Sequence, residues 1–213
     1  MRDEETATWW QQVTGEALYG PLKGRHLKYV PHDELTFEKW KAEQPSGTVL
    51  RPDQQFASSY ASANWEERMQ KTPVVTPASP NDPFSSRALI VGIDMNDTAK
   101  AYSFADLEKV GPIQDTVNGT PIVVVLGEDK KSVRAFERMV DGRTLDLFQK
   151  PDSPKLILVD PETASEFDFT GKGISGPLTG KQLRKIDLLL DYWFDWKNYH
   201  PKVDVYSGGE KSK

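Results

Sequence analysis

The chain has 213 residues, a net charge of −5 and no cysteine. This length allows one large domain or two small ones, each able to bury an apolar core. Without cysteine there are no disulfides, thiolate metal sites or cysteine nucleophiles, and the acidic balance argues against nonspecific binding of nucleic acid or anionic membranes. No apolar run approaches the ~20 residues of a membrane span, and the charged stretch Met1–Glu5 is not typical of a signal peptide.

Part of the sequence resembles another part of it. Residues 14–50 align with residues 170–206 at one constant offset (170 − 14 = 156), without a gap. Eleven of the 37 paired positions are identical, whereas composition alone gives roughly two or three. The pattern indicates a duplicated structural unit, so we expect the two segments to superpose.

Residues 1–50 form a partial first repeat, in which glycines predict tight turns. Residues 27–30 carry the alternation of a short strand. Asp33 or Thr36 can cap a helix that follows, and Pro45 ends it. Residues 51–87 are rich in proline and small polar residues, which predicts an extended connector, with a helix as one possibility over residues 56–68.

Residues 88–206 form the complete second repeat, and its first part is rich in predicted strands. Asn118-Gly119 is the strongest turn signal, because both residues tolerate positive φ. Asp141-Gly142 predicts a second hairpin in the same way. The sequence predicts strands over residues 88–94, 99–102, 115–117, 120–126, 133–139, 144–148 and 156–159, and one helix over residues 104–110.

The second repeat is predicted to end in an amphipathic helix over residues 187–199. Its apolar side chains recur at three- and four-residue steps, and Pro201 follows at the place paired with Pro45. We expect Trp193 and Trp196 to be core residues that pack on a sheet. Residues 207–213 are a polar tail.

Three motifs suggest chemistry, and each is explained better as structure. Gly171-Lys-Gly-Ile-Ser-Gly176 matches a dinucleotide fingerprint, but Pro177 follows where a helix should begin. Thr179-Gly-Lys181 lacks the first glycine and the final Ser or Thr of a P-loop. The three histidines have no ligand spacing, so the sequence predicts no metal site and no cofactor.

Several stretches together resemble one family. They are Thr6-Ala-Thr-Trp-Trp-Gln-Gln12, Gly15-Glu-Ala-Leu-Tyr-Gly-Pro-Leu-Lys-Gly24, Val91-Gly-Ile93, Lys100-Ala-Tyr102 and the Trp193-to-Pro201 segment. In order and spacing they are similar to domain-of-unknown-function family 3179. The resemblance implies a protein that is often secreted or periplasmic.

The resemblance also carries the candidate site residues. Lys100 and Tyr102 fall on the family's R-A-Y-P motif. The family's H-E-x-x-N-D and C-P-L-C motifs correspond to residues 110–127 of the second repeat, where only Asp115 remains of their chemical groups. Lys100, Tyr102 and Asp115 are therefore the candidate ligand-binding residues, and no catalytic residue is assigned.

We expect an α+β fold, mostly antiparallel β, with two related lobes that each end in a short amphipathic helix. Because the first repeat lacks most of its strands, unpaired edges would promote association. The sequence therefore favours a noncatalytic binding or assembly module, extracytoplasmic, in a larger protein or complex. Its expected partner is another polypeptide or a second copy that completes the partial repeat, with no nucleic acid and no direct membrane insertion.

Two alternatives stay open at this stage. The chain could be the scaffold half of a redox or metal-dependent enzyme, with the site in a missing N-terminal half or a partner chain. It could also bind a small ligand or a glycan through exposed aromatic side chains such as Trp9 and Trp65.

Overall fold

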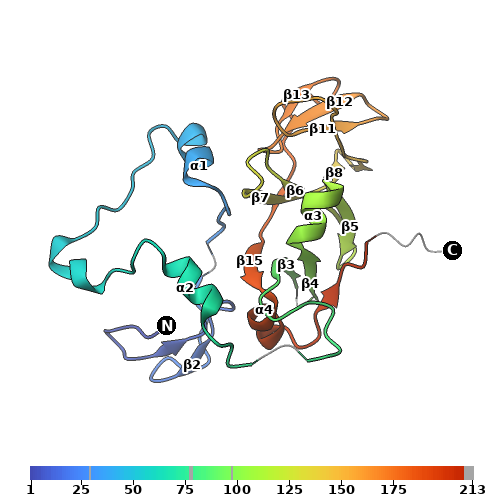
Figure 1. Cartoon of the computed structure of the whole chain (residues 1–213). Helices are drawn as coiled ribbons and strands as arrows, with labels where there is room; N and C mark the ends of the chain where they lie inside the picture. Colours follow the sequence, from blue (N-terminus) through green and yellow to red (C-terminus); the bar gives the residue numbers. More distant parts are fainter. Residues whose placement is uncertain (29, 77–78, 97, 209–213) are drawn as a thin grey trace.

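The structure is a computed structural model that describes residues 1–28, 30–76, 79–96 and 98–208 (Figure 1). The fold is α+β and mostly antiparallel, as the sequence predicts. Its helices are short, and none in the described residues is long and apolar enough to cross a membrane.

Residues 89–205 contain three four-stranded sheets, which we name the first, middle and third sheets. The described strands pair antiparallel, apart from β16, which runs parallel to β4. The first sheet has the order β15 (Leu189–Tyr192), β3 (Leu89–Met95), β4 (Thr98–Ser103), β16 (Asp204–Val205). The middle sheet has the order β14 (Lys185–Ile186), β7 (Val133–Glu137), β6 (Thr120–Leu126), β5 (Ile113–Val117). The third sheet has the order β10 (Phe148–Gln149), β11 (Ile157–Asp160), β12 (Ser165–Asp168), β13 (Gly173–Ser175).

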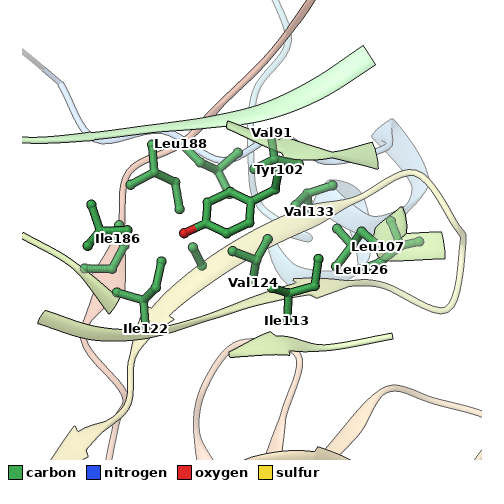
Figure 2. Close-up of a cluster of buried hydrophobic side chains, with 13 residues drawn as sticks. Val91, Tyr102, Leu107, Ile113, Ile122, Val124, Leu126, Val133, Ile186 and Leu188 are labelled. Carbon is green, nitrogen blue, oxygen red and sulfur yellow. The ribbon is translucent and has the colours of Figure 1, made fainter. Parts of the chain in front are cut away.

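The sheets stack in layers around two cores, and β6 contributes to both. Ile122 and Val124 on β6 lie in the core between the first and middle sheets, which Figure 2 shows. Val123 and Val125 lie in the core between the middle and third sheets. Because both faces of β6 are covered, its sequence is a continuous apolar run instead of an alternating one.

Two helices complete this part of the chain. Helix α3 (Phe104–Val110) begins at the Ser103 side chain, which accepts a hydrogen bond from the Asp106 N–H, and it buries Leu107 in the first core. Helix α4 (Trp193–Tyr199) covers the outer face of the first sheet with Trp193 and Trp196. A Cβ at Gly92 of β3 would lie 2.5 Å from the Trp196 ring, so the indole packs directly on the strand backbone.

The predicted turns are confirmed. Asn118 and Gly119 join β5 to β6 with φ of 46° and 76°. Asp141 and Gly142 have φ of 51° and 79°, and they join β8 (Met139–Val140) to β9 (Arg143–Thr144). Positive φ at both central residues matches the right-handed twist of the flanking strands, which is why these dipeptides specify hairpins.

The helix predicted over residues 187–199 is only half right. Residues 189–192 form β15, which pairs with β3 through Leu190 and Val91, and the helix begins at Trp193. The N–H of Trp193 still donates to the carbonyl of Ala88 at 2.9 Å. A short apolar run is compatible with either structure, and here the free edge of β3 selects the strand.

The strand predicted over residues 27–30 is wrong for Leu27, Lys28 and Val30, which lie in no strand. Tyr29 lies outside the described residues. Residues 185–186, which align with residues 29–30, form β14 and pair with β7. Among the described residues no strand lies beside residues 27, 28 and 30, and a strand needs a partner for its backbone groups.

The N-terminal part contains a small two-stranded sheet, β1 (Trp9–Trp10) and β2 (Ala17–Tyr19). Helix α1 (Phe37–Glu43) follows, and Thr36 caps it by accepting a hydrogen bond from the Lys39 N–H, as predicted. Figure 1 shows the connector looping away from the sheets. It carries a 3₁₀ helix, η1 (Gln54–Ser59), and α2 (Trp65–Lys71), neither of which buries a residue.

Candidate functional site

The structure brings the three sequence-predicted site residues together. Lys100 and Tyr102 lie two residues apart on β4, so they share a face of the first sheet. Asp115 lies on β5, an edge strand of the middle sheet. The Lys100 Nζ is 2.8 Å from Asp115 Oδ2, and the Tyr102 hydroxyl donates to the same oxygen at 2.9 Å. Asp204 on β16 is a second partner of Lys100, at 3.2 Å.

The electrostatics of this cluster favour a structural role. Burial raises the pKa of the fully buried Tyr102 hydroxyl, and the charge of Asp115 raises it further. Burial opposes the charge on Lys100, but the hydrogen bond and charge of Asp115 outweigh it and raise the pKa of the amine. At neutral pH the lysine therefore stays protonated and the tyrosine neutral, so neither is an available base or nucleophile. The cluster ties β4 to β5 and β16.

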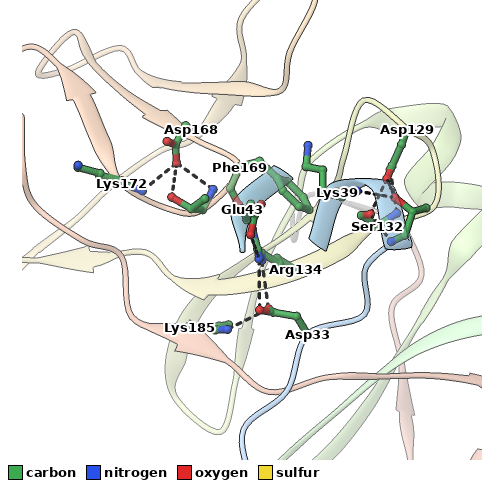
Figure 3. Close-up of polar contacts among 12 residues, drawn as sticks. Asp33, Lys39, Glu43, Asp129, Ser132, Arg134, Asp168, Phe169, Lys172 and Lys185 are labelled. Carbon is green, nitrogen blue, oxygen red and sulfur yellow. Dashed lines mark hydrogen bonds and ion pairs between the residues drawn. The ribbon is translucent and has the colours of Figure 1, made fainter. Parts of the chain in front are cut away.

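A second polar cluster attaches residues 33–43, which we name the α1 segment, to the middle sheet (Figure 3). Arg134 on β7 is only 5% exposed. Its guanidinium donates to both carboxylate oxygens of Asp33, at 3.1 and 3.2 Å, and to both of Glu43, at 2.9 and 2.6 Å. The same guanidinium lies 4.7 Å from the centre of the Phe169 ring. A buried arginine with two carboxylates is held in one geometry, because leaving its charge unpaired would be costly.

Further contacts fix the same segment. The Thr36 hydroxyl donates to Asp129 Oδ2 at 2.8 Å, and the Thr36 N–H donates to the Ser132 hydroxyl at 2.9 Å. Burial acts to raise the pKa of Asp129, but the hydrogen bonds from Ser132 and Thr36 lower it to about 2. The Val133 N–H donates to the carbonyl of Glu34 at 2.9 Å, so the segment also pairs with the first residue of β7.

Several apolar side chains are exposed on residues 3–28, which we name the N-terminal hairpin. Trp9 and Tyr19 are paired across β1 and β2 and are 53% and 67% exposed. Leu18 and Leu27 are also exposed, Leu27 at 48%. Exposed apolar side chains that gather on one small element mark an interaction surface more often than isolated ones do.

Residues 160–186, which we name the second hairpin, have the same backbone bonding. The Leu27 N–H donates to the carbonyl of Gly15 at 2.9 Å, and the Leu183 N–H donates to that of Gly171 at 2.8 Å. The two glycines have φ of 70° and 77°. The side chains differ in environment, because Leu183 is only 1% exposed and lies in the core between the middle and third sheets.

The similarity extends to the first turn of each hairpin. The Thr6 hydroxyl donates to Asp3 Oδ2 at 2.8 Å, and the Thr163 hydroxyl donates to Asp160 Oδ2 at 2.7 Å. Here the offset is 157 (160 − 3 = 157), because the N-terminal hairpin has one more residue before residue 14. The match in this turn thus lies outside the gapless alignment.

The sequence matches, over residues 1–203, the family described as a protein of unknown function, DUF3179. The chain belongs to the DUF3179 family. This confirms the resemblance seen in the sequence motifs. No curated protein and no solved structure matches the chain.

Elsewhere in this DUF3179 chain, the described residues contain no group of three or more His, Cys, Asp or Glu side chains that could hold a metal ion. One carboxyl group with a raised pKa is that of Asp191 on β15. Burial, with the nearby charge of Asp195, raises its pKa from 3.8 to about 6. Its Oδ1 accepts from the Tyr192 N–H at 2.7 Å, and its Oδ2 is buried without a hydrogen-bond partner.

Sequence reasoning missed Arg134 and its two carboxylate partners. An arginine in an alternating strand looks like a solvent-facing residue, and Asp33 and Glu43 lie 101 and 91 residues upstream. The one available signal was Asp33 and Thr36 ahead of α1, which we interpreted as helix caps. Thr36 does cap the helix, whereas Asp33 pairs with Arg134.

Proposed function

We propose that this DUF3179 chain is a noncatalytic binding or assembly module that docks on another polypeptide through its N-terminal hairpin. The observation that carries the proposal is one leucine in two environments. Leu27 is 48% exposed while Leu183, with the same backbone hydrogen bond in the second hairpin, is 1% exposed. An apolar position that is buried in the second hairpin and exposed in the N-terminal hairpin is suited to binding a partner.

The proposal includes an internal duplication, in which residues 3–50 and 160–206 descend from one unit. The gapless identities and the equal hydrogen bonds of the two hairpins support it. The helices agree too. Gln44 ends α1 with φ −124° and ψ 65°, and His200 ends α4 with φ −125° and ψ 71°. Superposition of the two segments in a crystal structure tests it, and a different hairpin topology would refute the duplication.

The docking surface is also positioned for a partner. Residues 33–43 are fixed to β7 by Arg134 and its carboxylates, so the hairpin is tethered close to the sheets. Val13 packs beside the α4 tryptophans at the outer face of the first sheet. The exposed side chains Trp9, Tyr19 and Leu27 stay outside this contact. A preformed, anchored surface loses less conformational freedom on binding than a free tail.

The experiment is affinity capture from the natural host with the full chain as bait, followed by native mass spectrometry. The test variant is Leu27→Asp, which places a charge on the exposed face. The matched control is Val75→Asp, the same kind of change at a connector residue that is 97% exposed. We expect a second polypeptide that Leu27→Asp loses at least tenfold and Val75→Asp retains.

Two outcomes would count against assembly through this face. A partner retained equally by both variants would place the interface elsewhere. A bare 24.0 kDa chain in every preparation would leave the hairpin without a protein partner. An extracytoplasmic location is part of the proposal and is supported by the family resemblance alone.

A second candidate function follows from Trp9 and Tyr19. These two side chains are cross-strand neighbours and both are exposed. Paired aromatic rings on a strand can stack on the apolar face of a sugar ring. Tryptophan fluorescence titrated with a glycan panel tests this, with Trp9→Ala as the variant and Trp65→Ala, an exposed connector tryptophan, as the control. If Trp9→Ala leaves the response unchanged, the platform does not bind sugars.

A further inference from the structure

The second hairpin identifies the kind of surface that covers such a face. Leu183 and Phe167 of the second hairpin are buried among apolar side chains of the middle sheet and of β11. The fit is closest at Gly171, where an added Cβ would lie 2.7 Å from the Phe136 ring of β7. The strand backbones also pair, since the Glu137 N–H donates to the carbonyl of Arg184 at 2.8 Å.

The N-terminal hairpin offers the same features without that cover. Gly15 stands where Gly171 does, and the three atoms nearest to a Cβ there all belong to Leu27 of its own hairpin, the nearest at 3.4 Å. Leu27 and Trp10 occupy the positions of Leu183 and Phe167. The carbonyl of Lys28 is at the position of the Arg184 carbonyl. The glycine, the two apolar side chains and this carbonyl thus recur in the N-terminal part of the chain.

The start of the hairpin keeps the register of a third-sheet strand. Arg2 forms a bridge with Trp9. At an offset of 157 these residues correspond to Val159 and Glu166, which are paired between β11 and β12. Arg2 thus lies beside β1 as Val159, near the end of β11, lies beside β12.

We propose that the occupant of the N-terminal hairpin is a β-sheet unit of the same design as residues 88–157, carried by another polypeptide. An edge strand of that unit pairs beside Lys28, and an aromatic ring packs over Gly15 as Phe136 packs over Gly171. This inference rests on the proposed function and specifies the partner. A second copy of this chain is disfavoured, because its own unit is already covered by its second hairpin.

A hairpin swap tests the complementarity within one chain, without the natural partner. Residues 160–186 are replaced by the sequence of residues 3–30, so that the N-terminal hairpin must fit β6, β7 and β11. We expect one cooperative unfolding transition in urea. We also expect a blue shift of tryptophan fluorescence, because the transplanted Trp10 takes the buried place of Phe167.

The control is Leu27→Asp, made at two places. When Leu27→Asp is made in the transplanted hairpin, the cooperative unfolding transition in urea should be abolished, because an unpaired charge would enter the core. At its native position it should leave the transition midpoint unchanged. If the transplanted leucine tolerates Asp, its side chain is not buried there and the proposal is wrong.

A shorter swap keeps the first turn of the second hairpin unchanged, so that a change in this turn cannot be the reason if the chain does not fold. Residues 170–186 are replaced by residues 14–30, which have the same length and keep Gly15 and Leu27 in register. If neither swap folds, the two hairpins are not interchangeable and the inference is overturned. A swap that folds while capture finds no Leu27-dependent partner would refute the proposed function and keep the complementarity. A captured partner without such a sheet unit, or a homodimer by native mass spectrometry, would refute the inference and keep the docking function.

Discussion

The N-terminal hairpin and the second hairpin have the same backbone hydrogen bonds and different surroundings. Their glycine turns close in the same way, with Leu27 and Leu183 bonded to equivalent carbonyls. Leu183 is covered by side chains from strands that precede it in the chain, whereas Leu27 is 48% exposed. The comparison teaches that turn residues specify the shape of this element locally, while its burial depends on sequence far away.

The largest expected difference between the hairpins is the cost of removing the shared leucine. Leu183→Ala should lower the free energy of unfolding by about 2–5 kcal/mol, because it leaves a cavity in a closed core. Leu27→Ala should change it by less than about 0.5 kcal/mol, because the side chain is half exposed. Urea unfolding of both variants measures this. Equal losses would show that the N-terminal hairpin is covered in solution.

The helices give a second comparison, of intermediate size. Gly92→Ala should cost about 1–3 kcal/mol, because the new methyl group meets the Trp196 ring in a packed core. Gly47→Ala places a methyl group equally close to the Trp40 ring, but α1 buries no residue and this ring can move. Thermal unfolding should show a lower midpoint for Gly92→Ala alone. A comparable fall for Gly47→Ala would mean that α1 is as firmly packed as α4.

The smallest expected effect concerns Asp191, which aligns with Leu35 at the offset of 156. The pKa of Asp191 is raised from 3.8 to about 6. Between these values the unfolded chain loses its proton first, so stability falls as the pH rises and the penalty is complete above about pH 6. Asp191→Asn should therefore raise the free energy of unfolding at pH 7 by about 1 kcal/mol, allowing for its partial exposure.

The pH dependence distinguishes this from a general effect of losing a charge. At pH 4 the gain from Asp191→Asn should disappear, because the carboxyl is then protonated in the folded state. Asp152→Asn, at an exposed turn, is the matched control and should have no effect at either pH. Urea titrations at pH 4 and pH 7 measure both. A gain that persists at pH 4 would show that Asp191 is not held with a raised pKa.

The parts of this fold that were predictable are those whose cause is local. Asn118-Gly119 specifies a turn by its own φ preferences, and the helix predicted over residues 104–110 has a local cap, the Ser103 side chain. Residues 187–192 were mispredicted because an apolar run suits a helix or a strand until its neighbour is known. Here the neighbour is β3, almost 100 residues upstream.

The candidate site shows the same limit. Lys100 and Tyr102 could be placed on one face of a strand from sequence, since side chains alternate. Asp115 was named from the family resemblance, and its contacts with Lys100 and Tyr102 come from the structure. Arg134 gave no local sign of its role, because its carboxylate partners Asp33 and Glu43 lie 101 and 91 residues upstream.

The ion pairs of the α1 segment also set an order of events during synthesis. Asp33 pairs with Lys185 as well as Arg134, and Lys185 is made 152 residues later. At roughly 5–20 residues per second, the segment waits on the order of ten seconds or more after leaving the ribosome before this contact can form. Until then this contact does not hold the segment, and the hairpin before it, on the sheets. If the proposed partner binds the N-terminal hairpin, it can reach the hairpin before this contact forms, while translation is still under way.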